Sequence, residues 1–156
     1  MLNVRVGALL VRGNSVLMVN GSHGDYYTVG GRVRFGETMQ SALMREISEE
    51  LGNEAELLQG GELCVLLENF FRIDGVKFHE LSAYYLFDAS ALTVKSGVYV
   101  CDEKETLQWI SVDEMKDLKL YPLFLKEGIP PKGEIKFLSI VEEDFEDGKD
   151  AVSERP

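Results

Sequence analysis

"GRVRFGETMQSALMREISEELG", residues 31–52, combines a helical repeat with an unusual group of acids. An α-helix advances about 100° per residue, and on that repeat the apolar residues of the stretch form one stripe: Met39, Leu43, Ile47 and Leu51. Gly52 follows the stripe directly, and a glycine there is typical of a helix C-terminus. The stretch therefore predicts an amphipathic helix over residues 38–51 that packs its stripe against a core.

Three carboxylates, those of Glu46, Glu49 and Glu50, crowd the last turns of this helix beside the apolar stripe. Like charges four residues apart cost about 0.2–0.5 kcal/mol, and acids at a helix C-terminus cost about 0.3–1 kcal/mol more. These costs share one sign, and a divalent cation would offset them together. Clustered carboxylate oxygens suit Mg²⁺ or Mn²⁺ better than Zn²⁺, so we expect this helix to hold a hard metal ion.

The segments around the helix have the apolar composition and turn signals of strands. The expected strands cover residues 4–12, 16–20, 62–73, 76–87, 107–112 and 134–140. The dipeptide Asp74-Gly75 between two of them is a strong hairpin signal, and Ser111 with Glu114 forms a capping-box pattern that opens a short helix over residues 113–118. Strands before and after a central helix predict an α+β protein with a mixed sheet.

The net charge of −11 is spread unevenly along the chain. Residues 142–156 hold seven acidic and two basic side chains and few apolar ones, so we expect a disordered acidic tail after one domain over residues 1–141. An acidic body argues against binding long nucleic acid through its phosphates, which requires a basic stripe. The chain has no signal-peptide pattern and no apolar run of the roughly 18 residues that a membrane span needs. This predicts a cytoplasmic protein that does not enter a membrane.

Seven residues of the opening stretch resemble, in type and spacing, the Nudix box of the Nudix hydrolase superfamily: Gly31, Glu37, Arg45, Glu46, Glu49, Glu50 and Gly52. YYTVGG before the box and LQWISVDEMKDLKLYP after it are more loosely similar to the flanking segments of MutT-like members. Two positions depart from the family pattern. Val29 stands where the family often has proline, and Asn53 stands where the box ends in an aliphatic residue. Neither supplies a metal ligand, so we expect altered loop packing with the chemistry kept.

The resemblance implies an α/β/α sandwich in which the box helix packs on a mixed β-sheet. It also implies Mg²⁺ as the cofactor, with Mn²⁺ as a substitute. The implied ligands are three side chains and one backbone carbonyl: Glu46, Glu49, Glu50 and the carbonyl of Gly30. Gly31 and Glu37 would support this site, and Arg45 would hold the glutamates in place through charge-assisted hydrogen bonds.

Members of the family hydrolyse a nucleoside diphosphate linked to another group. For a small MutT-like chain the resemblance favours a nucleoside triphosphate, including an oxidised one, cleaved to monophosphate and pyrophosphate. The proton of the attacking water would pass to a box glutamate, Glu49 or Glu50, or to an acid of the loop over residues 101–106. In that loop Glu103 is the first candidate and Glu105 the second, although each is equally consistent with a solvated loop charge.

A nucleobase commonly stacks on a flat side chain, and four residues are candidates for that contact: Tyr27, Phe71, Phe78 and His79. Alternation along the strands sends some of these side chains into the core, so each is also consistent with packing alone. We expect a small-molecule nucleotide as the partner. Exposed strand edges and the habit of the family favour a homodimer.

Other functions remain open at this point. Within the same reaction class, ADP-ribose or a nucleotide-sugar could be the substrate. A Nudix module that senses a nucleotide without hydrolysis is a further alternative, which the intact box disfavours. Isomerisation of an isoprenoid diphosphate would need a positioned cysteine. Cys64 lies in an apolar strand like a core thiol, whereas Cys101 lies near the acidic loop.

Overall fold

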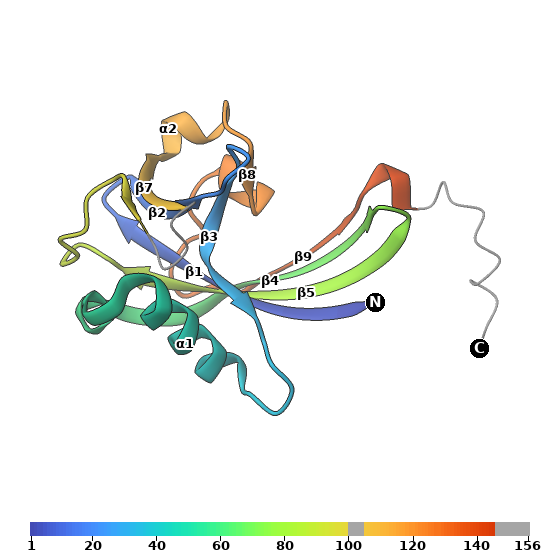
Figure 1. Cartoon of the computed structure of the whole chain (residues 1–156), viewed down its shortest axis with the longest axis horizontal. Coiled ribbons are helices and arrows are strands. Elements are labelled where there is room, and N and C mark those ends of the chain that lie inside the picture. Colours follow the sequence, from blue (N-terminus) through green and yellow to red (C-terminus); the bar gives the residue numbers. More distant parts are fainter. Residues whose placement is uncertain (100–104, 146–156) are drawn as a thin grey trace.

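A computed structural model describes residues 1–99 and 105–145. In these residues one mixed β-sheet carries the long helix α1 on one face and short helices on the other (Figure 1). The strands are β1 (Leu2–Arg12), β2 (Ser15–Asn20), β3 (Tyr26–Arg32), β4 (Gln59–Ile73), β5 (Val76–Asp88), β6 (Val98–Tyr99), β7 (Thr106–Ser111), β8 (Leu120–Tyr121) and β9 (Lys136–Val141). The helices are α1 (Met39–Leu51) and α2 (Val112–Met115), with 3-10 turns η1 (Gly52–Leu57), η2 (Leu123–Glu127) and η3 (Glu143–Phe145). The predicted α+β class, with the long helix on a mixed sheet, is confirmed.

The sheet of the described residues runs in the order β6-β7-β2-β3-β1-β5-β4-β9, and β8 pairs with β3 beside this path. The pairs β1–β5, β4–β9 and β3–β8 are parallel, and the other pairs are antiparallel. Because β1 and β5 are distant in the chain, their parallel pairing joins the N-terminal half of the domain to the β4–β5 hairpin.

The first expected hairpin forms only at its tip. There Val11 pairs with Val16 and Arg12 pairs with Ser15. Beyond these pairs the two strands separate and β3 enters between them, hydrogen-bonded to β1 on one side and to β2 on the other. This insertion brings β3 to the middle of the sheet, directly before the loop that leads into α1.

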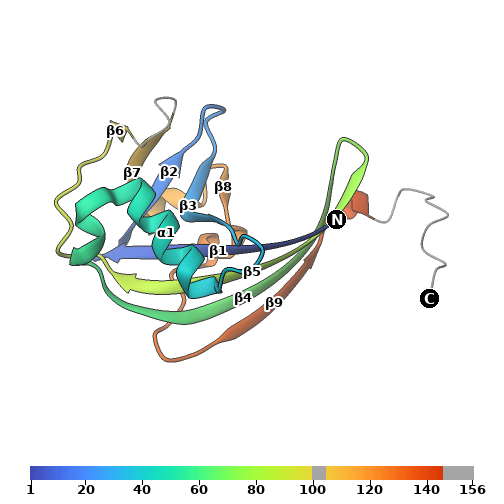
Figure 2. The same ribbon diagram turned by 60° about the horizontal axis from the view of Figure 1, so that its bottom comes forward.

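The second hairpin forms where Asp74-Gly75 predicts it. Asp74 has φ 50° and Gly75 has φ 79°, the left-handed conformations that Asp-Gly tolerates and that two-residue hairpin turns require. Its long strands β4 and β5 continue beyond α1 as an arm of the sheet. Figure 2 shows β1, β5, β4 and β9 side by side in this arm, curving away from α1.

Apolar side chains form two buried clusters, one on each face of the sheet. The buried residues of α1 belong to the predicted stripe and one neighbour: Ala42, Leu43, Ile47 and Leu51. Thr38 caps this helix, because its Oγ1 accepts a hydrogen bond from the Ser41 amide at 3.0 Å. The opposite cluster contains Met115 of α2 and Leu125 of η2. No helix of the described residues is long and apolar enough to cross a membrane.

The described residues reach into the segment for which an acidic tail was expected. The helix predicted over residues 113–118 is shorter, since α2 ends at Met115, and it begins with the predicted capping box. Of the expected acidic tail, η3 is part of the structure, and its Phe145 ring packs edge-on against Phe70 with 5.5 Å between centroids. Residues 146–156 lie outside the described residues. Cys64 is buried in the core, and Cys101 lies outside the described residues.

Candidate active site

Two glycines let the C-terminal half of α1 approach the backbone of β3. A Cβ added to Gly31 would lie 2.4 Å from the carboxyl carbon of Glu46, and a Cβ on Gly30 would lie 2.2 Å from the carbonyl oxygen of Val6. At Gly30 no side chain fits, because the contact is with backbone, whereas a side chain at Gly31 would have to displace the Glu46 carboxylate. The Glu46 carboxylate therefore lies directly against the strand backbone.

Arg45 links the loop before α1 to the acids of its last turns. Its guanidinium donates to both carboxylate oxygens of Glu37, at 2.8 Å from Nε and 3.0 Å from Nη2. Nη1 donates to Glu46 Oε1 at 2.7 Å, and Nη2 also donates to the Arg32 carbonyl at 3.2 Å. The bidentate pairing with Arg45 lowers the pKa of Glu37 to about 2. The planar Arg45 guanidinium thus joins Glu37 to Glu46 through charge-assisted hydrogen bonds.

Glu49 and Glu50 differ in their surroundings although they are neighbours. The Glu49 side chain is 51% exposed and lies 3.7 Å from Arg45 Nη1. Glu50 points inward, and its Oε2 is buried with no hydrogen-bond partner in the described structure. Burial raises the pKa of Glu50 to about 8, and the nearby charges of Glu46, Glu105 and Glu49 add to the rise. A hydrogen bond from the Gly30 backbone opposes it. Glu50 is therefore an acid whose charge lacks compensation from the protein.

The raised pKa of Glu50 gives a prediction for the metal-free protein. Its pKa rises from 4.5 to about 8 on folding, so unfolding releases protons between these values and the stability falls as the pH rises through this window. A glutamine side chain stays neutral at every pH, so the variant does not lose this stability as the pH rises. We expect Glu50→Gln to stabilise the metal-free protein by about 4 kcal/mol at pH 8, roughly 12 °C in Tm, and by almost nothing at pH 4.5. Thermal melts in EDTA at both pH values measure this, and an equal difference at both would contradict it.

The residues present fit a divalent cation. The described residues contain no group of three or more His, Cys, Asp or Glu side chains arranged to hold an ion. Glu46 accepts a hydrogen bond from Arg45, and Glu50 accepts one from the Gly30 backbone. One oxygen of Glu50 is nevertheless buried without a hydrogen-bond partner among the described residues, so it is available to a cation. The donors around it are hard oxygens, which are the ligands that Mg²⁺ and Mn²⁺ prefer.

Of the two loop acids expected near this site, the structure describes one. Glu105, directly before β7, lies close enough for its charge to raise the pKa of Glu50. Glu103 lies outside the described residues. A cavity of about 360 Å³ opens beside Glu50 and is also lined by Glu54, Thr93 and Lys95. It leaves room for a charged group next to the carboxylates.

A larger cavity, of about 570 Å³, lies on the face of the sheet opposite α1. Three of the four candidate substrate contacts line it: Tyr27, Phe71 and Phe78. Gly30 lies at its edge, and Gly30 also contacts Glu50. Gly30 of β3 therefore lies between the cavity and the carboxylates of α1.

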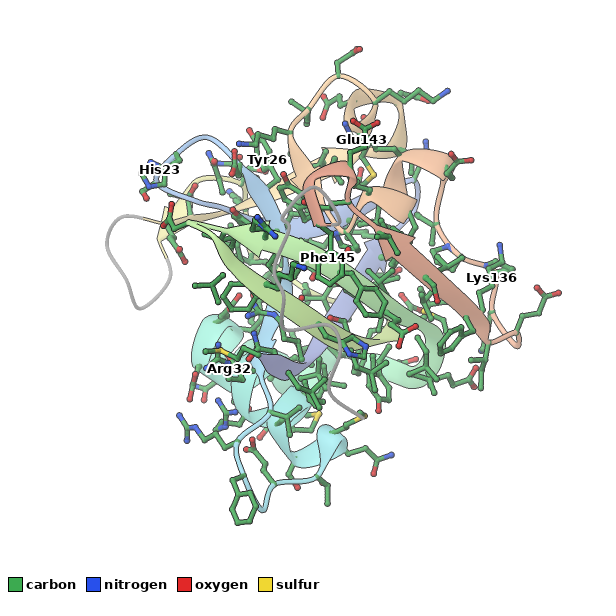
Figure 3. All side chains as sticks on the ribbon, turned by 90° about the vertical axis from the view of Figure 1, so that its right-hand side faces the viewer. His23, Tyr26, Arg32, Lys136, Glu143 and Phe145 are labelled. Carbon is green, nitrogen blue, oxygen red and sulfur yellow. The ribbon has the colours of Figure 1, made fainter. Side chains whose placement is uncertain are left out.

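His79, the fourth candidate, does not line this cavity. Successive side chains of a strand point to opposite faces, so His79 lies on the other face from Phe78. There its Nε2 is 2.8 Å from Glu68 Oε2, and its ring stacks on Phe70 at 4.2 Å between centroids. Figure 3 shows the end of this arm, where β9 runs from Lys136 to the turn that carries Glu143 and Phe145.

The cavity also contains polar residues that were not predicted from the sequence. They come from three adjacent strands and include Asn3, Arg5, Asn69, Glu80 and Ser82. A signal was present in β5, where Glu80 and Ser82 follow Phe78 at two-residue intervals. Polar residues at the alternating positions of an otherwise apolar strand indicate a face that is not ordinary core.

Comparison with known proteins agrees with this geometry. The family model described as NUDIX domain matches residues 1–130. The MutT protein from Bacillus halodurans is 17% identical, with a TM-score of 0.62 over 92% of this chain and 93% of that chain. A MutT Nudix hydrolase from Burkholderia pseudomallei is 24% identical, with a TM-score of 0.55 over 72% of this chain and 85% of that chain. The dihydroneopterin triphosphate pyrophosphohydrolase from E. coli is 18% identical, with a TM-score of 0.55 over 76% and 85%.

At these identities the structural matches establish a shared fold. No curated protein matches the chain. The family model, by contrast, covers most of the sequence, including β3, α1 and the acids described above. The chain therefore belongs to the Nudix hydrolase family, whose enzymes act on nucleoside diphosphates linked to another group.

Proposed function

We propose that the protein is a cytoplasmic, Mg²⁺-dependent hydrolase that cleaves a nucleoside triphosphate to a monophosphate and pyrophosphate. The observation that carries this proposal is the position of Gly30. It borders the cavity of about 570 Å³ and contacts Glu50. A nucleoside held in that cavity would direct its phosphates past Gly30 toward the acids of α1. The cavity is within the size range of small-ligand sites.

The ligands in this proposal are Glu46, Glu49, Glu50 and the Gly30 carbonyl. A cation bound there would neutralise the diphosphate and lower the pKa of the attacking water. The chain itself supplies orientation: Arg45 holds Glu46 at 2.7 Å, and Glu37 holds Arg45. A carboxylate then accepts the proton of the water. Glu49 is the exposed box acid that can do so. Glu103 and Glu105, in the loop over residues 101–106, are the other candidates.

A panel of phosphate compounds tests the proposal. The purified protein is incubated with Mg²⁺, with Mn²⁺ or with EDTA and with nucleoside triphosphates, oxidised deoxynucleoside triphosphates, ADP-ribose, nucleotide-sugars or dinucleoside polyphosphates. We expect metal-dependent release of pyrophosphate and a monophosphate from a triphosphate. Turnover confined to ADP-ribose or a nucleotide-sugar would show that this compound, and not a nucleoside triphosphate, is the substrate. No turnover, with a nucleotide still raising Tm, would indicate a sensing module.

The proposal includes a homodimer formed through β9. This strand ends the sheet path of the described residues, and its exposed side includes Phe137, which is 61% exposed. An apolar edge strand is a template for pairing with a second chain. Light scattering should give twice the chain mass of 17.5 kDa, and Phe137→Lys should reduce it to one chain. A wild-type monomer at every concentration would contradict the dimer.

A further inference from the structure

A row of polar side chains crosses the floor of the large cavity. Glu80 of β5 pairs with Asn69 of β4 on one side and with Asn3 of β1 on the other. All three line the cavity. Neighbouring strands lie about 4.8 Å apart, so the row extends over about 10 Å. The adjoining row of the same floor is apolar, formed by Phe71 opposite Phe78.

The acceptors of this row are poorly satisfied within the described residues. Asn69 Oδ1 is buried without a partner in the described structure, and Asn3 is only 9% exposed. Glu80 Oε1 accepts only a long hydrogen bond, 3.5 Å from Ser82 Oγ, in the described structure. Burial raises the pKa of Glu80, while the charges of Arg5 and Arg32 oppose the rise. Buried polar groups normally find partners, so this row has unused acceptors that face a cavity.

Aromatic side chains shape the rest of the cavity for a flat ligand. Phe71 and Phe78 stack with 5.2 Å between centroids and an interplanar angle of 9°. On the wall formed by β3 and β8, Tyr27 and Tyr121 stack at 5.8 Å and 20°. All four rings line the cavity. A planar ring system can contact these faces while its polar edge meets the row.

We propose that this row recognises the 2-amino-oxopyrimidine edge of a guanine-type base, with Glu80 and Asn69 as specificity-determining residues. That edge presents a ring N–H and an amino group beside a carbonyl oxygen. Glu80 accepts from the ring N–H and from one amino hydrogen, and Asn69 Oδ1 accepts from the other amino hydrogen. Asn3 donates its amide N–H to the carbonyl. Adenine places an unprotonated ring nitrogen against Glu80, so two acceptors would face each other.

This inference deepens the proposed function, on which it rests for the nucleotide character of the ligand. The same edge occurs in guanine nucleotides and in pteridines. Direct binding separates the inference from catalysis, because monophosphates can be titrated in EDTA without turnover. The probes are dGMP, dAMP, dIMP, which lacks the 2-amino group, and neopterin monophosphate. Isothermal titration gives Kd for each.

We expect wild type to bind dGMP about 30-fold more tightly than dAMP, in the range for one bidentate base contact. Glu80→Gln should weaken dGMP binding about 30-fold and leave dAMP within threefold. Asn69→Ala should weaken dGMP about tenfold and leave dIMP unchanged, since dIMP has no amino group for Asn69 to contact. Glu62→Gln, an exposed acid of β4, is the matched control and should change nothing. Unchanged Tm values would show that the variants fold.

Selective binding of dGMP or of neopterin monophosphate supports the inference and distinguishes the two sources of the edge. Equal affinity for dGMP and dAMP, or a loss at Asn69→Ala that is the same for dGMP and dIMP, would overturn it. Selective binding without hydrolysis would leave this inference standing while the proposed function fails. Hydrolysis without base selectivity would support the proposed function and overturn this inference.

Discussion

Glu50→Gln should lower kcat of the proposed hydrolysis by about 10³-fold, the size typical of losing an essential carboxylate. Glutamine fills the same space, but it cannot carry the negative charge that a metal ion and a developing proton transfer require. Among the described residues, Glu50 is the acid with a buried oxygen that has no hydrogen-bond partner, so a neighbouring exposed acid cannot take its place. Steady-state kinetics with Mg²⁺ and the best compound of the panel measure the change.

The matched control for this variant is Glu56→Gln, an exposed acid in η1 just after the same helix. It should keep kcat within twofold. Because Glu50→Gln should also melt at a higher temperature than wild type at pH 8 in EDTA, loss of activity cannot be attributed to unfolding. If the variant retains a third or more of wild-type kcat, Glu50 is not essential to the reaction.

Gly30→Ala and Gly31→Ala should fail in different ways although they are adjacent. The Cβ at Gly30 meets backbone, the Val6 carbonyl oxygen at 2.2 Å, and backbone of a central strand cannot move aside. We expect a loss of about 3 kcal/mol, roughly 9 °C in Tm. The Cβ at Gly31 meets the end of the Glu46 side chain, which can rotate away. The fold should survive, but kcat should fall about 10²-fold because Glu46 leaves its position.

Each glycine variant serves as the control for the other. Thermal melts and kcat are measured on both, and the prediction is the crossed pattern: stability lost in one and activity lost in the other. If Gly31→Ala keeps full activity, the position of Glu46 against β3 has no part in the reaction. If Gly30→Ala melts with wild type, the close approach of β3 to β1 is not rigid.

Local patterns predicted the parts of the fold that depend on near neighbours in the chain. The stripe of α1 needed only a helical repeat, and the β4–β5 hairpin needed only Asp74-Gly75. The insertion of β3 between β1 and β2 depends on pairings such as Gly7 with Gly30, which join distant segments. No short window contains that information, so the sequence predicted a plain hairpin there.

The residues of the candidate site also fall into a group that the sequence predicted and a group that it did not. The acids of α1 and Arg45 lie within one stretch whose spacing resembles a known family, so they were found together. The row of Asn3, Glu80 and Asn69 exists only through the register of three strands. A shift of one residue would turn these side chains to the other face. The same rule separates His79 from Phe78, because aromatic character alone does not say which face a residue occupies.

The strand β9 has a consequence for the order in which the protein becomes competent. Its residue Ile140 lines the cavity and pairs with Asn69, whereas the acids of α1 lie 90 to 94 residues earlier in the chain. Domains emerge from the ribosome N-terminus first. A nascent chain can therefore form its helix of acids well before it can complete the cavity beside them. The cavity in which we propose that a nucleoside binds is therefore complete only when β9 has joined the sheet.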